Sequence, residues 1–191
     1  MIPDSPPNEI SITPLIKGSE FSDWKSLNDS IMGGSSHANC LSSDKGLILE
    51  GNLVEEGGGF VSCRSPIFKV PINLANYSGL ILEVEGEGRT LKFAIACEKS
   101  PLALSNLLKG DIRWVASIPT QKEGISTIKI PFNNFEPARR AKPVRLPLRF
   151  DRSCINRFQL LHSKFGQPGE MNSGFFAGPI KVLIKSISAY S

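Results

Sequence analysis

Apolar and polar residues alternate along most of this 191-residue chain. A period of two residues is typical of a β-strand that buries one face, and it is clearest at residues 47–53, 80–85 and 91–97. Further strands are predicted at residues 10–16, 60–64 with a continuation at 67–70, 111–118, 124–130, 154–161 and 180–190. The pattern therefore predicts roughly nine or ten short strands.

Several of these strands carry residues that predict irregular pairing. Pro14 lacks an N–H group and favours an edge position for residues 10–16. Gly51, and the change of apolar register between Ile184 and Ile187, each indicate a β-bulge. A glycine-rich turn at residues 86–89 separates two alternating segments, so residues 80–85 and 91–97 are predicted to form a hairpin.

Helical periodicity is confined to one short segment, residues 101–108, whereas 17 Gly and 14 Pro indicate many turns. Short strands separated by turn residues are typical of an all-β, two-sheet β-sandwich. No repeat or linker divides the chain. We therefore expect a loose lead-in at residues 1–10 and a single β-sandwich domain at residues 11–191.

The net charge of +4 is unevenly distributed. Residues 1–138 hold 12 Lys and Arg against 16 Asp and Glu, whereas residues 139–191 hold 10 against 2 and carry a charge of +8. This basic third begins with Arg139, Arg140, Lys142 and Arg145. Such residues form either a solvated face or a surface for an acidic protein or anionic headgroups. Aromatic residues are not interleaved with them as base stacking requires, so nucleic acid is not an expected partner.

The cysteines and the N-terminal residues bear on location. Cys40, Cys63, Cys97 and Cys154 show neither CxxC nor Cys/His spacing, so no zinc site is indicated and reduced structural thiols are expected. The N-terminal residues lack the basic and apolar regions of a signal peptide, and no apolar run reaches the about 18 residues of a membrane span. We expect a cytoplasmic protein, at most peripheral to a membrane.

Common catalytic motifs do not occur in the sequence. His37 and His162 stand far apart and outside any HExxH array, and no serine lies in a GxSxG elbow. The glycines that follow Asp29 are not followed by the lysine of a phosphate-binding loop. We therefore expect no catalytic residue, no metal and no cofactor, and a non-enzymatic role.

The most distinctive segment is an irregular loop at residues 24–36. It combines the aromatic residue Trp24 with the turn formers Asn28 and Asp29 and with a glycine pair, Gly33-Gly34. Asn and Asp side chains hydrogen-bond to nearby backbone, and glycine supplies positive φ or close backbone approach. The composition predicts a packed loop of fixed shape.

Two arginines offer either a brace for this loop or a ligand site. Arg64 and Arg89 each follow a glycine-rich turn, and an arginine pinned to Asp29 would hold the loop in place. The same groups could instead form an open site that clamps a carboxylate or a phosphate. In that case the protein would be a small-ligand binder or an enzyme.

Two sequence blocks together resemble the signature of the complex I intermediate-associated protein 30 family. The first is Trp24 followed by Asn28-Asp29-Ser30-Ile31-Met32-Gly33-Gly34-Ser35, and the second is Gly58-Gly59-Phe60-Val61-Ser62-Cys63-Arg64. Later blocks, including the turn that ends in Arg89, extend the likeness over about residues 15–190. The signature or binding residues it singles out are Trp24, Asn28, Asp29, Met32, Gly33, Gly34, Ser35, Gly58, Gly59, Phe60, Arg64 and Arg89.

The resemblance implies a galactose-binding-like jelly-roll sandwich, the fold that many carbohydrate-binding modules also use. It also implies an assembly or accessory factor, because mitochondrial members look like chaperones for respiratory complex I and related domains are associated with biogenesis of photosynthetic complexes. The resemblance is to a bacterial or photosynthetic-organism member, and the lack of a transit peptide fits a bacterial cytoplasmic member better than a mitochondrial precursor. The expected partners are protein subunits of a membrane complex or its assembly intermediates. Because fold does not fix function, a carbohydrate-binding module that stacks sugars on Trp24, Tyr77 and Trp114 is an alternative.

Overall fold

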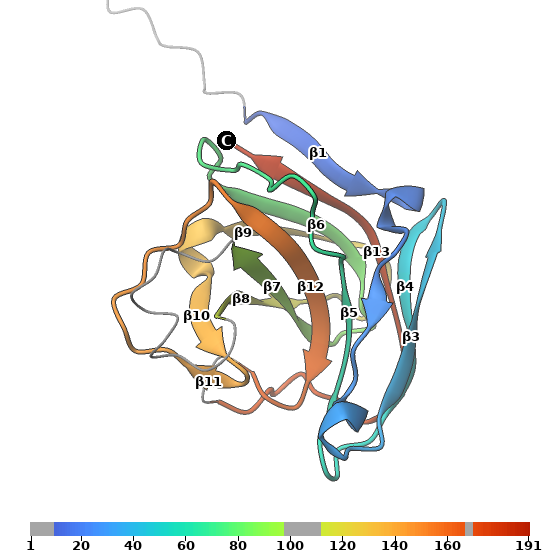
Figure 1. The fold of residues 1–191 in the computed structure, drawn as a ribbon. Helices are drawn as coiled ribbons and strands as arrows, with labels where there is room; N and C mark the ends of the chain where they lie inside the picture. The colour runs from blue at the N-terminus through green and yellow to red at the C-terminus, as the bar shows by residue number, and fades with distance from the viewer. Residues whose placement is uncertain (1–9, 98–111, 167–169) are drawn as a thin grey trace, which may run out of the picture.

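A computed structural model describes residues 10–97, 112–166 and 170–191 of the chain. Two antiparallel β-sheets pack against each other (Figure 1), which confirms the predicted all-β sandwich. Within the described ranges the helical elements are three short 3-10 turns, η1 (Gly18–Phe21), η2 (Asp29–Met32) and η3 (Phe132–Asn134). The helix expected at residues 101–108, and the lead-in up to residue 9, lie outside the described residues.

The first sheet has six strands. Its main path runs β3 (His37–Ser43), β4 (Gly46–Leu53), β13 (Gly178–Tyr190), β6 (Gly79–Glu85) and β9 (Ser126–Pro131), and β1 (Ile12–Lys17) also pairs with β13. Along one side β13 pairs first with β4 and then with β1, so β1 lies at an edge as Pro14 predicts. The pairing of β13 with β6 shifts register between Ile184 and Ser186, which confirms the bulge predicted there.

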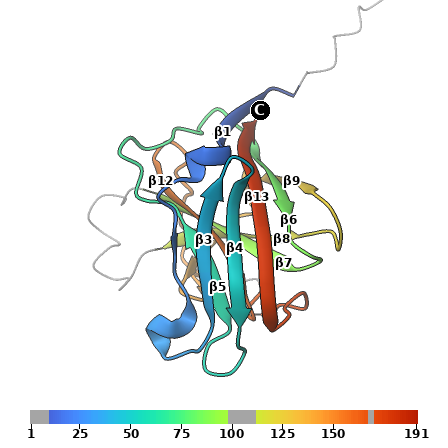
Figure 2. The same cartoon turned by 90° about the vertical axis from the view of Figure 1, so that its right-hand side faces the viewer.

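The second sheet has seven strands in the order β11 (Lys142–Pro143), β10 (Glu136–Arg139), β8 (Arg113–Pro119), β7 (Thr90–Cys97), β12 (Ile155–Ser163), β5 (Phe60–Arg64) and β2 (Lys25–Ser26). Figure 2 shows β3, β4 and β13 of the first sheet in front of strands of the second. The core lies between the sheets, where Leu80, Leu82 and Val84 of β6 and Leu91, Phe93 and Ile95 of β7 are fully buried.

The hairpin predicted for residues 80–85 and 91–97 does not form. β6 pairs with β13 and β9 in the first sheet, whereas β7 pairs with β12 and β8 in the second. The turn at residues 86–89 therefore carries the chain from one sheet to the other. Both strands alternate because each buries one face in the shared core, and the alternation does not reveal which sheet a strand joins.

Two smaller predictions are also wrong. β4 pairs with β3 and β13 without a register shift, so Gly51 marks no bulge. A Cβ at Gly51 would lie 2.0 Å from the carbonyl oxygen of His37, and this close backbone approach requires a glycine. Residues 67–70 form no strand, and Ile67 and Val70 are 63% and 78% exposed.

A disulfide between Cys40 of β3 and Cys63 of β5 overturns the expectation of reduced thiols for this pair. The two strands belong to opposite sheets, and their Cα atoms lie 5.9 Å apart, a normal separation for a disulfide. The separation of 23 positions between the cysteines gives no signal in the sequence, because the pairing depends on how the sheets face each other. Disulfides are typical of oxidising compartments, so the cysteines do not support a cytoplasmic location.

Candidate functional site

The loop that precedes β3 begins with a core residue. Trp24 is 6% exposed and packs edge to face on Phe21, with 5.3 Å between the ring centroids. β2 and η2 follow, and Gly33 ends η2 with a φ of 86°. This left-handed conformation is one that glycine adopts without strain, and it turns the chain towards β3.

The carboxylate of Asp29 connects the two signature blocks. The side chain is fully buried, and its Oδ1 accepts a hydrogen bond from the Ser36 N–H at 2.9 Å. Its Oδ2 accepts from the N–H groups of Gly59 at 2.6 Å and Phe60 at 3.3 Å. We call these four residues, Asp29, Ser36, Gly59 and Phe60, the Asp29 latch. Burial alone would raise the pKa of Asp29, but the hydrogen bonds from Ser36, Gly59 and Phe60 hold this pKa below its usual value.

The arginine that the sequence suggested as a partner of Asp29 is not in that position. Arg89 lies beside Glu87 instead, and neither ion pair found in the described residues includes Asp29. Main-chain N–H groups satisfy the buried carboxylate instead, as they do in many buried acidic sites. The loop is therefore braced by backbone of the second block and not by a side-chain cation.

Gly34 and Gly58 provide the space that the carboxylate occupies. A Cβ on Gly34 would lie 2.4 Å from Cγ of Asp29, and a Cβ on Gly58 would lie 2.4 Å from its Oδ2. Gly59 has a φ of 91°, which again favours glycine. Each glycine pair of the signature thus combines one close approach to Asp29 with one left-handed residue.

Further hydrogen bonds fix both ends of the loop. Asn28 Nδ2 donates to the carbonyl oxygen of Ala38 at 3.0 Å. The Oγ of Ser36 accepts from the Val54 N–H at 2.9 Å and donates to the Val54 carbonyl oxygen at 3.0 Å. Ser35, which the sequence singled out, is exposed. The sequence missed Ser36 because two adjacent serines fit the pattern equally well.

The same loop exposes two apolar side chains. Ile31 and Met32 of η2 are 65% and 67% exposed. Figures 1 and 2 both place η2 beside the β4–β5 loop at one end of the sandwich. Neither side chain contributes to the core, although the Asp29 latch holds the backbone beneath them. Large contiguous apolar patches mark protein interaction sites, whereas single exposed apolar residues are common on protein surfaces.

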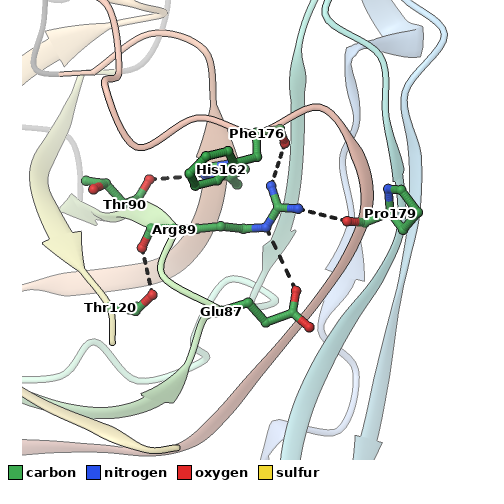
Figure 3. Close-up of polar contacts among 7 residues, drawn as sticks. All are labelled: Glu87, Arg89, Thr90, Thr120, His162, Phe176 and Pro179. Carbon is green, nitrogen blue, oxygen red and sulfur yellow. Dashed lines mark hydrogen bonds and ion pairs between the residues drawn. The ribbon is translucent and has the colours of Figure 1, made fainter. Parts of the chain in front are cut away.

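Arg89 lies in a different setting, where it anchors the chain that leads into β13. The side chain is 5% exposed. Its Nη1 donates to the Phe176 carbonyl oxygen, its Nη2 donates to that of Pro179 at 2.8 Å, and its Nε lies 4.0 Å from the Glu87 carboxylate (Figure 3). These contacts use the guanidinium to hold backbone, so Arg89 does not present an open clamp for a ligand.

His162 is buried beside Arg89 and acts as a core residue. Its Nδ1–H donates to the Thr90 carbonyl oxygen at 3.1 Å, and its ring stacks on Phe175 (Figure 3 shows the Thr90 contact). Its Nε2 has no hydrogen-bond partner among the described residues. Burial, together with the positive charge of Arg89, lowers the pKa of His162 to about 4. The ring is therefore neutral near pH 7.

Arg64 and the basic residues of the C-terminal third occupy other parts of the second sheet. Arg64 ends β5 and lines a pocket with Lys25 and Arg157. Arg139, Arg140, Lys142 and Arg145 lie on β10, on the turn to β11, on β11 and just after it. The structure therefore brings Asp29 together with both glycine pairs, and it leaves Arg64, Arg89 and the basic group outside that assembly.

The aromatic residues considered for sugar stacking are held in the protein interior. Trp114 is 9% exposed and stacks on Phe150, with 4.7 Å between the ring centroids. Tyr77 is half-buried, and its hydroxyl donates a hydrogen bond to the Thr13 hydroxyl at 3.1 Å. With Trp24 also buried, none of the three is a free stacking platform.

The described residues also lack some features of metal or membrane-spanning proteins. In residues 10–97, 112–166 and 170–191, no group of three or more His, Cys, Asp or Glu is placed to hold a metal ion. No helix in the same ranges is long and apolar enough to cross a membrane.

Solved structures similar to this chain include carbohydrate-binding modules. The family 11 module of a cellulosomal cellulase of Clostridium thermocellum has a TM-score of 0.63 and 15% identity, with 94% of each chain covered. The module from that organism in complex with a β-1,3-1,4-mixed-linked tetrasaccharide has a TM-score of 0.61 and 15% identity, with 93% of this chain and 94% of that chain covered. An agarase has a TM-score of 0.55 and 9% identity, and the match covers 94% of this chain but 24% of the agarase. These likenesses show the jelly-roll sandwich fold.

Sequence comparison identifies the family. No curated protein matches the chain. The model of the complex I intermediate-associated protein 30 family, however, matches residues 15–182. This range includes both blocks joined by the Asp29 latch and nearly all strands of the sandwich. The protein therefore belongs to the complex I intermediate-associated protein 30 family.

Proposed function

We propose that this protein is a non-enzymatic accessory factor for assembly of a membrane respiratory complex of the complex I type, or of a photosynthetic complex. Membership of the complex I intermediate-associated protein 30 family carries the proposal. The arrangement of the signature residues supports it, because Asp29 and the glycines are engaged in backbone contacts. They do not form the combination of nucleophile, base and oxyanion donors that catalysis requires.

Ile31 and Met32 are the proposed contact residues for the protein partner. Both are about two-thirds exposed, and the Asp29 latch holds the loop that carries them. A preorganised loop pays less conformational entropy on binding. Methionine adapts its shape to a partner surface, so it is common where binding surfaces must fit several shapes.

The basic residues Arg139, Arg140, Lys142 and Arg145 assist the encounter in this proposal. Arg140, Lys142 and Arg145 are exposed, and Arg139 is half-buried. Within the described part of the chain, none of them belongs to an ion pair. A cluster of unpaired cations speeds association with an acidic protein surface, and salt weakens the effect.

Affinity purification from native membranes tests the proposal. Met32→Glu places a charge at the proposed contact, and Leu41→Glu is a matched control because Leu41 is 52% exposed on β3. We expect subunits of a membrane complex to co-purify with the wild type and the control but not with Met32→Glu. Wild-type protein that returns alone, with normal complexes in a deletion strain, would contradict the proposal.

Carbohydrate binding has weaker support. It draws on the fold shared with the family 11 modules, at 15% identity. The burial of Trp24 and Trp114 removes the aromatic platforms that the sequence offered for it. Calorimetric titration with a β-1,3-1,4-linked tetrasaccharide checks this alternative, and we expect no heat of binding.

A further inference from the structure

Three cationic residues lie next to one another on the outer face of the second sheet. Lys25 of β2 is paired directly with Arg64 of β5, and Arg64 is paired with Gln159 of β12. Arg157 precedes Gln159 by two residues, so it lies on the same face. Val61 and Cys63, which alternate with Arg64, face the core instead.

The direct pairing of Lys25 with Arg64 has no evident benefit within the fold. Like charges placed directly opposite each other on paired strands destabilise a sheet. Within the described residues, neither Lys25 nor Arg64 forms an ion pair. The preceding Asp23 also has a left-handed backbone with a φ of 67°. Strained backbone and like-charge pairs that do not stabilise the fold are concentrated at functional sites.

The three cations line one pocket of about 370 Å³, together with Asp23, Ser65, Pro66 and Ile67. Its wall is fixed by Ser65, which is 1% exposed. The Ser65 N–H donates to the Phe158 carbonyl oxygen at 2.9 Å, and the Ser65 Oγ accepts from the Phe158 N–H at 3.0 Å. The chain that follows Arg64 is thus held against β12. The Ser65 side of the pocket is therefore held in place by the fold.

We propose that this pocket binds a carboxylate side chain from an acidic segment of a protein partner, with Arg64 as the main anchor. A guanidinium matches the two oxygens of a carboxylate, and Lys25 and Arg157 add positive charge beside it. Ile67 is 63% exposed at the rim and offers an apolar contact to the rest of the segment.

The form of the pocket favours a side chain carried by a protein over a free small anion. Asp23, Lys25, Pro66 and Ile67 are all exposed, whereas sites for small ligands bury most of the ligand surface. The protein nature of the ligand rests on the proposed function. The position of the anion site does not, because it follows from the pocket and its charges.

Fluorescence anisotropy with a labelled Glu-rich peptide tests the pocket in the purified full chain. We expect the peptide to bind the wild type, and binding to weaken as ionic strength rises. Arg64→Gln should weaken binding about tenfold, as expected for the loss of one charge-assisted contact. Lys122→Gln removes the same single charge at an exposed site and should weaken binding less than about twofold.

Thermal unfolding of the same variants shows whether Arg64 binds the peptide or instead stabilises the fold. Arg64→Gln removes the like-charge pair with Lys25, so its melting temperature should equal or exceed that of the wild type. A clear fall would show that Arg64 braces the fold and would overturn the proposal. So would absence of peptide binding, or Arg64-dependent binding of inorganic phosphate or anionic vesicles alone.

The outcome is independent of the membrane-complex assignment. The assay contains purified protein and peptide only, so its failure would leave the role of Met32 untested and intact. If no membrane-complex subunits co-purified with the wild type, the proposed function would fail, but the peptide assay would still test the anion pocket.

Discussion

The carboxylate Oδ2 of Asp29 lies 2.6 Å from the main-chain nitrogen of Gly59, although 30 positions separate the residues in the chain. This hydrogen bond joins η2, which lies between β2 of the second sheet and β3 of the first, to the residue before β5. The position of η2, with its exposed Ile31 and Met32, therefore depends on a contact with the chain that enters β5. Substitution of Asp29 should therefore lower stability, whereas substitution of the exposed Met32 should affect partner binding alone.

Asp29→Ala should destabilise the fold. It leaves the buried N–H groups of Ser36 and Gly59 without their acceptor, and we expect a loss of about 3 kcal/mol in the free energy of unfolding. Urea denaturation measures this loss. Asp44→Ala is the control, because Asp44 is exposed in the turn between β3 and β4. Equal midpoints for both variants would contradict the role of the Asp29 latch.

A double-mutant cycle with Gly34→Ala tests the steric part of the latch. The new Cβ would meet Cγ and both oxygens of Asp29, so Gly34→Ala alone should cost about 1–3 kcal/mol. Asp29→Ala removes those three atoms, and in that background Gly34→Ala should cost much less. Gly58→Ala is the contrasting case, because its Cβ would also lie 2.5 Å from Cβ of Asp29. Asp29→Ala should therefore not reduce the cost of Gly58→Ala to the same extent. If the costs of Gly34→Ala and Asp29→Ala simply added, the contact between the two residues would be contradicted.

Sequence alone predicted the strands well because burial of one face leaves a period-two pattern. β4, β6 and β7 lie where that pattern is strongest, whereas β2, β3, β10 and β11 were not predicted. The partners of the strands were harder to predict. β6 and β7 were expected to pair as a hairpin, yet each pairs in its own sheet, since the turn between them has the same composition in either arrangement.

The candidate site was predicted in part for a similar reason. The Asn, Asp and Gly residues of the loop indicated a fixed shape, but an arginine was expected to hold Asp29. Main-chain N–H groups hold it instead, and these leave no trace in a sequence because nearly every residue carries one. The pocket at Lys25, Arg64 and Arg157 was missed because strand pairing, not spacing, brings these residues together.

The stability of the protein should fall in mild acid because of His162. Its pKa is about 4 in the fold, against 6.5 as the reference value, so the unfolded chain takes up the proton first as the pH falls. The contribution of the neutral ring is complete above pH 6.5, and up to about 3 kcal/mol is lost on going down to pH 4. Denaturation at a series of pH values measures this slope.

The two histidines provide a matched comparison for that slope. His162→Gln should flatten the dependence of stability on pH between 4 and 6.5, whatever its effect on stability at pH 7. His37→Gln changes an exposed residue and should leave the slope unchanged. A wild type with equal stability at pH 6.5 and pH 4.5 would show that His162 titrates normally.

The disulfide between Cys40 and Cys63 should be detectable by mass and by stability. The chain has four cysteines, and two of them are paired. Alkylation of the unfolded protein should therefore modify two thiols without reductant and four after reduction. Reduction should lower the free energy of unfolding by about 3 kcal/mol for a loop of this length. Modification of four thiols without reductant would contradict the pairing.

Co-purification from native membranes, quantified by mass spectrometry for the wild type, Met32→Glu and Leu41→Glu, tests the assembly role most directly. We expect all three proteins to melt at similar temperatures, because both substituted side chains are mostly exposed. Subunits of one membrane complex should be recovered with the wild type and Leu41→Glu, and recovery should fall at least about tenfold with Met32→Glu, as for a contact residue at the centre of an interface. Equal recovery with Met32→Glu and Leu41→Glu would contradict binding through η2, and recovery of no such subunits with the wild type would contradict the assembly role.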